Sequence, residues 1–274
     1  MTNRQIRRQA YRVYRDSFRV FIGVAALAAI PAILGLVLNI FIEPQFRQIS
    51  SLLMGIAGYP LVLGTVRFFF KSFHGESSFV SEIFYYYKAA RLAGALFLGA
   101  AITALNFASA QLNTFLRELT QIDIRFFFMH LPYFALATWI YFRLFLVPYV
   151  YIGNHTATKN PLVTIKESFR QMKGYFIDIA IFSVTVYFIP VLVLVPVFIF
   201  VVSAVGSWFV SINLLASVFW FLSIPFAPYI GLSFAGFAAG LLLPPAPKRK
   251  IKKPLQGSYR YNKKKYRYKT DWFD

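Results

Sequence analysis

The stretch VFIGVAALAAIPAILGLVLNIFI, Val20 to Ile42, decides the fold of this chain, because it holds no charged residue over a length that can cross a bilayer. A helix rises about 1.5 Å per residue, so roughly 20 apolar residues span the hydrocarbon core, which is about 30 Å thick. The run is also longer than the apolar core of a cleaved signal peptide, which has about 7–15 residues. We therefore expect it to form the first membrane span.

Five more apolar runs of similar length follow along the chain. We expect them to cross the membrane at Ile49–Phe70, Ala89–Asn113, Phe127–Tyr151, Phe176–Ser203 and Phe209–Leu243. The composition agrees, since 58% of the 274 residues are hydrophobic and only 14% are charged, against about 25% charged in a soluble domain. The expected fold is an all-α polytopic membrane protein of about six transmembrane helices. Residues 1–243 would form the membrane domain, and residues 244–274 a disordered cytoplasmic tail.

Lys and Arg residues lie almost entirely on one side of these spans. The N-terminal segment, the loops after spans two and four, and the C-terminal tail hold most of the 29, while the opposite side holds only Arg47, Arg117 and Arg125. Cytoplasmic loops of membrane proteins carry an excess of Lys and Arg. We therefore expect a bacterial inner-membrane protein with both termini in the cytoplasm, in which most of the formal charge of +19 reflects topology.

A short amphipathic segment precedes each odd-numbered span on the basic side: Arg7–Phe21, Phe79–Gly94 and Asn160–Phe176. In the third segment, apolar residues recur at spacings of three and four, as on one face of a helix: Leu162, Ile165, Phe169 and Met172. Amphipathic helices of this kind lie in the headgroup layer with the apolar face toward the acyl chains. We therefore expect interfacial helices before spans one, three and five, with Phe169 and Met172 facing lipid.

The first and third of these segments share a short string. Residues 15–19 read RDSFR, and residues 166–170 read KESFR. One explanation is an internal repeat of an interfacial helix followed by a helical hairpin, present three times. The alternative is that both segments acquired similar residues because both lead a helix into the bilayer.

Several local patterns carry a resemblance to a known group. They are the basic amphipathic N-terminus, Gly75-Glu76 before an aromatic cytoplasmic segment, Pro148-Tyr149 near the end of span four, and SFRQMKG from Ser168 to Gly174. With them, residues 1–243 resemble the bacterial multi-pass membrane proteins grouped as domain of unknown function 975. They resemble, more distantly, the membrane domain attached to some glycerophosphodiester phosphodiesterases. The resemblance implies a helical membrane architecture and assigns no activity.

Residues that usually carry catalysis or bind metals are sparse. The chain has no cysteine, its three histidines lie in different loops, and no two carboxylates fall within one span. A two-carboxylate hydrolase, a proton relay and a three-histidine metal site are therefore not expected. A Gly-rich phosphate loop is also missing from the sequence. We expect neither an enzyme nor a bound cofactor.

Two arginines fall within spans, where a charge marks either function or a side chain that reaches the headgroups. Arg67 lies close to the cytoplasmic end of span two, so we expect its guanidinium to snorkel to the headgroups. Arg143 lies deeper, about 12 Å from the end of span four at about 1.5 Å per residue, and needs a partner. We expect an intramembrane ion pair with Asp178, with a substrate site as the alternative.

Spans five and six contain four prolines, and span six has a Gly-x-x-x-Gly spacing at Gly236 and Gly240. Such residues interrupt helices at the binding sites of transporters, but they also kink helices and allow close packing. We expect a non-enzymatic membrane scaffold or accessory subunit that binds another membrane protein, with a small transporter as the alternative.

The tail interleaves tyrosines with cations that we expect to contact anionic lipids: Lys248, Arg249, Lys250, Lys252, Lys253, Lys263, Lys264 and Lys265. Each basic residue near an anionic surface adds about 1 kcal/mol of attraction. Stacking of the tail tyrosines on single-stranded or ribosomal RNA is the alternative.

Overall fold

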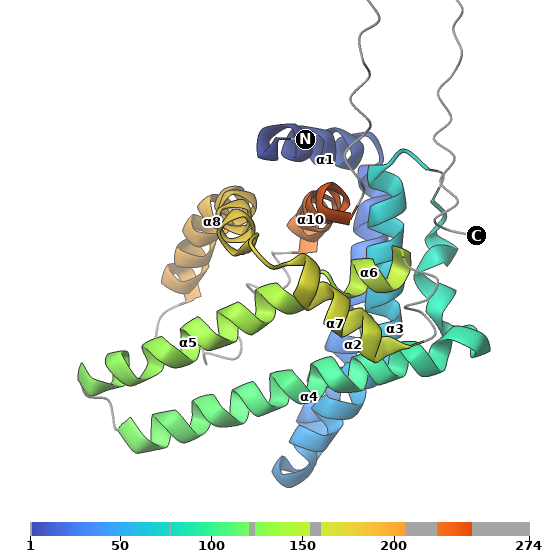
Figure 1. The fold of residues 1–274 in the computed structure, drawn as a ribbon. Coiled ribbons are helices and arrows are strands. Elements are labelled where there is room, and N and C mark those ends of the chain that lie inside the picture. The colour runs from blue at the N-terminus through green and yellow to red at the C-terminus, as the bar shows by residue number, and fades with distance from the viewer. Residues whose placement is uncertain (1, 77, 121–123, 154–159, 206–223, 243–274) are drawn as a thin grey trace, which may run out of the picture.

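The computed structural model describes residues 2–76, 78–120, 124–153, 160–205 and 224–242 of the chain. Within these ranges every regular element is a helix, so the protein is all-α as the sequence predicts (Figure 1). Five helices are long and apolar enough to cross a membrane, and a bent sixth helix passes the same test when its two parts are counted together. The fold is that of a multi-pass helical membrane protein.

The helices follow the order of the predicted spans. The span helices are α2 (Phe18–Phe41), α3 (Arg47–Phe73), α4 (Ala89–Thr120), α5 with α6 (Ile124–Leu144 and Val147–Gly153), α8 (Phe176–Val205) and α10 (Ala227–Leu242). Short 3-10 helices, η1 (Pro44–Phe46) and η4 (Ile224–Phe226), precede α3 and α10. Residues 209–223 of the predicted sixth span lie outside the described residues.

Three further elements lie before spans one, three and five, where the sequence predicts interfacial helices. They are α1 (Asn3–Asp16), the 3-10 helix η2 (Val80–Tyr87) and α7 (Pro161–Gln171). The element before span three is therefore a 3-10 helix, and two of its side chains, Ile83 and Tyr86, are buried in the protein. Whether α1 and α7 lie in the headgroup layer stays a prediction.

Prolines interrupt two of the spans. Pro148 has no N–H to bond the carbonyl of Leu144, and a turn at Phe145 and Leu146 separates α5 from α6. The span that the sequence predicts at Phe127–Tyr151 is thus formed by two helices, α5 and α6. α8 bends by 42° at its break before Pro190, since a proline removes a hydrogen bond there too.

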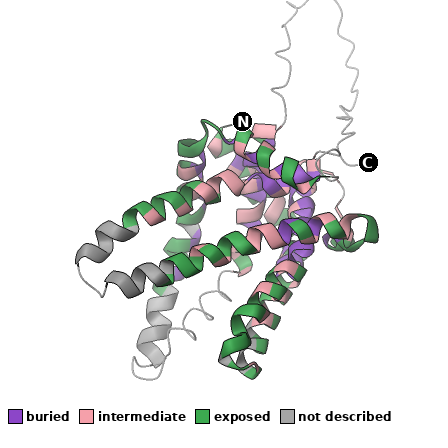
Figure 2. Cartoon of the chain, turned by 60° about the horizontal axis from the view of Figure 1, so that its bottom comes forward, coloured by how far each residue is buried: buried purple, intermediate pink, exposed green. Residues whose placement is uncertain are grey.

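The protein core lies at the end of the bundle that the Lys and Arg distribution assigns to the cytoplasm. Its buried side chains include Phe68 late in α3, Leu98 early in α4, Val150 in α6, Phe182 early in α8 and Leu232 in α10. Away from this end, the α2–α3 and α4–α5 hairpins diverge, and their residues become mostly exposed (Figures 1 and 2). Exposed apolar side chains on these arms are compatible with lipid, whose tails are as apolar as leucine.

α1 packs on this core and contacts α10 and the end of α3. The Thr2 hydroxyl accepts from the N–H of Gln5, and the Gln5 side chain accepts from the N–H of Thr2, which forms a capping box. Ile6 and Ala10 are buried, and α1 packs against α10. Gln9 donates to the carbonyl of Phe73 at 2.8 Å and so ties α1 to the end of α3.

α7 turns a largely polar stripe toward the protein. Thr164, Ser168 and Met172 recur every four residues, and none is more than 1% exposed. The expectation that Met172 faces lipid is therefore wrong, because this stripe lies on the side of α7 that packs against α5 and α6. Leu162, which is 61% exposed, remains on the outer side of the helix.

Glycines of α10 allow close packing against α3. A Cβ at Gly231 would lie 2.5 Å from the ring of Phe69, and a Cβ at Gly236 would overlap the ring of Phe73. Phe69 and Phe73 are one helical turn apart, so the same face of α3 packs against α10 at both glycines. Gly240 has nothing within 4 Å of such a Cβ, so the Gly-x-x-x-Gly spacing does not account for this contact.

Candidate functional site

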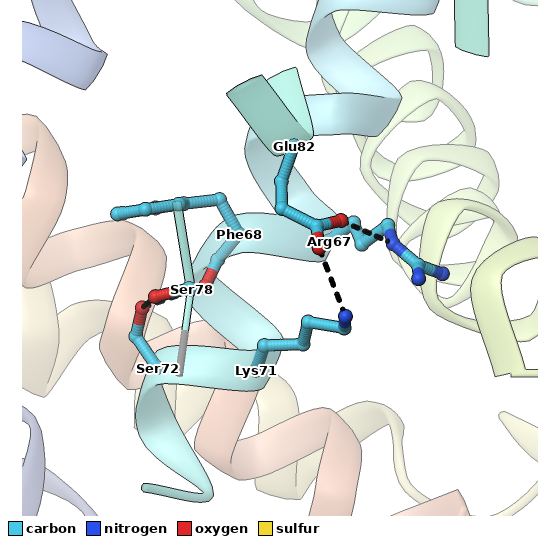
Figure 3. Close-up of polar contacts among 6 residues, drawn as sticks. All are labelled: Arg67, Phe68, Lys71, Ser72, Ser78 and Glu82. Carbon is cyan, nitrogen blue, oxygen red and sulfur yellow. Dashed lines mark hydrogen bonds and ion pairs between the residues drawn. The ribbon is translucent and has the colours of Figure 1, made fainter. Parts of the chain in front are cut away.

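A charged cluster joins the end of α3 to η2. Arg67 and Lys71, four residues apart on α3, both point at Glu82 of η2 (Figure 3). Arg67 Nε donates to Glu82 Oε2 at 2.8 Å, and Lys71 Nζ donates to Glu82 Oε1 at 3.0 Å. The side chains of Arg67 and Glu82 are 5% and 18% exposed. One carboxylate is thus shared by two cations at the edge of the core.

Arg67 does not snorkel, and the prediction that it reaches the headgroups is wrong. Besides its ion pair, its guanidinium lies 3.9 Å from the ring centroid of Tyr85. Arg91, at the start of α4, lies 3.8 Å from the same centroid. A guanidinium over an aromatic ring is stabilised by about 0.5–2 kcal/mol. Tyr85 therefore links the cations of α3 and α4.

The approach of η2 to α3 depends on Gly64. A Cβ at this position would overlap the backbone carbonyl of Ile83. Because glycine has none, the backbones meet, and Ile83 and Tyr86 are almost completely buried. A second polar contact holds the same junction, since the hydroxyls of Ser72 and Ser78 lie 2.6 Å apart (Figure 3). Gly64 is thus what lets Glu82 reach Arg67.

Two opposing effects set the pKa of Glu82. Burial raises the pKa, and the hydrogen bonds and charges of Arg67 and Lys71 lower it by more, so the net shift is downward from the usual value. Glu82 is therefore ionised at neutral pH, as a counter-charge for two cations must be.

Arg143 joins α5 to α7. Its Nη1 donates to the carbonyl of Phe169 at 2.6 Å, and the Ser168 hydroxyl donates to the carbonyl of Arg143 at 2.6 Å. Its guanidinium also lies 5.2 Å from the ring centroid of Trp139. These reciprocal bonds hold the buried stripe of α7 against the end of α5.

The predicted ion pair between Arg143 and Asp178 is not formed. Among the described residues, the ion pairs involve neither of these two side chains. Asp178 is exposed at the start of α8, whereas Arg143 uses a backbone carbonyl as its acceptor. The helix that precedes span five, and not a carboxylate at the start of that span, supplies the partner of Arg143.

A cavity of about 620 Å³ lies between the α4–α5 hairpin and the helices α3, α8 and α10. Its walls are mostly apolar, and its polar groups are chiefly hydroxyls, including those of Tyr133, Tyr149 and Tyr187. The Tyr133 hydroxyl lies 2.8 Å from that of Ser109 and so joins α5 to α4. Arg143 is not one of the residues that line this cavity.

Within the described ranges, no group of three or more His, Cys, Asp and Glu side chains is arranged to hold a metal ion. The tail cations from Lys248 to Lys265 lie outside the described residues, so their contacts with anionic lipid stay a prediction.

Sequence reasoning missed Glu82 as the central residue of the cluster. The available signal was the spacing of Arg67 and Lys71, which places both cations on one helical face. Two carboxylates follow, Glu76 and Glu82, and the spacing alone does not choose between them. The choice depends on the contact at Gly64, which only the structure reveals.

The chain matches no family model, no curated protein and no solved structure. Its function must therefore be argued from the geometry of the site.

Proposed function

We propose that this protein is a non-enzymatic scaffold or accessory subunit of the bacterial inner membrane, with both termini in the cytoplasm. We further propose that it belongs to the group named domain of unknown function 975, which its local patterns resemble. The observation that carries the proposal is the division of the bundle into one packed end and diverging apolar arms (Figure 2). A rigid end with separate arms suits a protein that holds neighbours in the membrane.

The bonding partners of the two intramembrane arginines support a scaffold role over a transporter role. Transporters place such charges toward a water-filled cavity or pathway. Here Arg67 is engaged by Glu82, and Arg143 by the carbonyl of Phe169. Both cations join helices within the packed end, and the cavity is lined by other residues.

The α2–α3 arm and the exposed side of α8 offer lateral surfaces for a partner helix. On α2, Leu34, Val37 and Phe41 are exposed, and on α8, Val184 and Phe188 are exposed. Helices associate in membranes through such close apolar packing. We expect the partner to be a membrane protein that packs along one of these two surfaces.

Photo-crosslinking in native membranes tests the proposal. A photoreactive residue at Leu34, which is 48% exposed, should yield one discrete crosslinked membrane protein. The same residue at Leu63, which is fully buried, is the matched control and should yield none. Only lipid adducts at Leu34, Val37 and Val184 would contradict the scaffold role.

A second measurement separates the transporter alternative. Because the chain has no cysteine, Ala137→Cys introduces a single thiol into the cavity wall. A scaffold predicts that charged, membrane-impermeant thiol reagents do not reach it. Rapid reaction from either side of the membrane would favour a transporter.

A further inference from the structure

We propose that the cavity beside the α4–α5 hairpin is a binding site for one acyl chain of a membrane phospholipid, whose ester carbonyl accepts from Tyr149. This inference goes beyond the scaffold role and does not depend on it. It is carried by the position of the cavity, its volume, the chemistry of its walls and an unpaired hydroxyl on a residue that lines it.

Position and lining favour an apolar occupant over water. The cavity lies among span helices, and along α4 it is lined from Ile102 to Leu112, a length of about 15 Å at about 1.5 Å per residue. Apolar cavities stay dry unless several polar groups converge on the water. Most of the wall is made of side chains such as Leu105, Leu136 and Phe234.

Volume decides between an acyl chain and a protein helix. A helix is about 10 Å wide, so three turns of it fill on the order of 1,300 Å³. The cavity holds about 620 Å³, which is within the range of about 300–1,000 Å³ for small-molecule sites. A single extended chain fits, and a helix of a partner or of a second copy does not.

A tyrosine hydroxyl indicates where the polar end of the ligand lies. Tyr149 lines the cavity and is only 6% exposed, yet its hydroxyl has no hydrogen bond to any other described residue. A phenolic hydroxyl is a hydrogen-bond donor, so this one can donate to a group bound in the cavity. Tyr149 lies four residues before Gly153, the last residue of α6, so it is about 6 Å from the end of the span at about 1.5 Å per residue. That depth suits a phospholipid ester.

Tyr187 of α8 adds a second hydroxyl of the same kind. It also lines the cavity and has no hydrogen bond to a described residue, although its side chain is 41% exposed. Tyr133, by contrast, already has a partner in Ser109. Tyr149 and Tyr187 are therefore two hydroxyls of the cavity wall that are available to a ligand carbonyl.

Lipid retention tests the site. The full chain, reconstituted with phosphatidylglycerol and extracted in mild detergent, should retain about one phosphatidylglycerol per protein by mass spectrometry. Ala137→Trp fills the cavity wall and should lower retention several-fold. Ala135→Trp is the control, since Ala135 lies two residues away on the exposed side of α5 and does not line the cavity.

Equal retention by the two tryptophan variants would overturn the proposal. Removing both hydroxyls, in Tyr149→Phe with Tyr187→Phe, should also lower retention several-fold, and unchanged retention would overturn the carbonyl contact. Because Ala137→Trp could prevent folding, the unmodified protein supplies a second readout. Phosphatidylglycerol with a photoreactive acyl chain should label cavity residues of α4 and α5, in competition with unlabelled lipid. Labelling spread evenly over the outer faces, or crosslinks to a protein from Ala137, would also overturn it.

Discussion

Glu82 supplies the counter-charge for Arg67, a role that the sequence analysis assigns to the lipid headgroups. Replacing Glu82 with Gln removes the carboxylate that faces Arg67 and Lys71 in a nearly buried site. Breaking one side of a buried ion pair costs about 3–5 kcal/mol. We expect the Glu82→Gln protein to unfold at a clearly lower temperature in detergent.

Glu167→Gln is the matched control for this change. Glu167 pairs with Arg170, whose side chain is 77% exposed, at 2.7 Å. Exposed pairs contribute about 0–1 kcal/mol, so this variant should unfold near the temperature of the unmodified protein. Equal losses in the two variants would contradict the assignment of Glu82 as the central counter-charge.

The lowered pKa of Glu82 gives the same residue a pH signature. A carboxyl group whose pKa is lower in the folded than in the unfolded protein stabilises the fold above its unfolded pKa, here about 4.5. That stability is lost as the pH falls through the lower, folded pKa. Unfolding temperatures measured from pH 6 downward should therefore fall more steeply below about pH 4.5 in the unmodified protein than in Glu82→Gln. Parallel curves for the two proteins would count against the ion pair.

The sequence predicts which spans contain a charged residue, but it does not predict the partner of that residue. Arg67 and Arg143 stand out as cations within apolar runs. Their partners are a carboxylate 15 residues away and a carbonyl 26 residues away, on elements that pack only in the folded protein. The sequence favours Asp178 as the partner of Arg143 because it lies near the start of span five on the same side of the membrane, but Asp178 is in fact exposed.

At the scale of elements, the junction of α3 and η2 should tolerate no side chain at Gly64. Gly64→Ala would force the Cβ against the carbonyl of Ile83, and overpacking of this kind costs about 1–3 kcal/mol. Gly240→Ala, where nothing lies within 4 Å, is the control. Glycine within a helix is less stable than alanine by about 0.5–1 kcal/mol, so this variant should unfold at an unchanged or slightly higher temperature. A harmless Gly64→Ala would mean that η2 does not approach α3 so closely.

The packing of α7 also explains why its apolar periodicity did not identify the side that faces the protein. The apolar residues of this segment recur at helical spacing, and the helix forms where the sequence predicts it. The side that faces the protein, however, carries Thr164 and Ser168, because Ser168 bonds the carbonyl of Arg143. In a membrane, apolar side chains can face lipid and polar ones must find partners inside, so hydrophobicity alone does not identify the inner face.

For the whole molecule, the spans were predictable and the location of the core was not. An apolar run of about 20 residues is a local signal, and the described spans fall on the predicted runs. Both halves of a run look alike in composition, whereas burial concentrates at one end of the bundle (Figure 2). Packing at that end depends on small residues such as Gly64 and Gly231, which are two of 15 glycines in the sequence.

The orientation of the whole molecule is the remaining expectation to test. Reporter fusions after Phe46 and Thr120 should report the exterior, and fusions after Ser77, Asn160 and Asp274 should report the cytoplasm, because Lys and Arg are concentrated on that side. The fold independently places α1 and the end of α3 at one end of the bundle, since α1 packs on α10 and Gln9 of α1 donates to the carbonyl of Phe73. α7 is held to the end of α5 by Arg143 and Ser168, so Asn160, its cap, must share that side. An exterior signal at Asn160 together with a cytoplasmic one at Ser77 would contradict both the charge rule and the packing of α7.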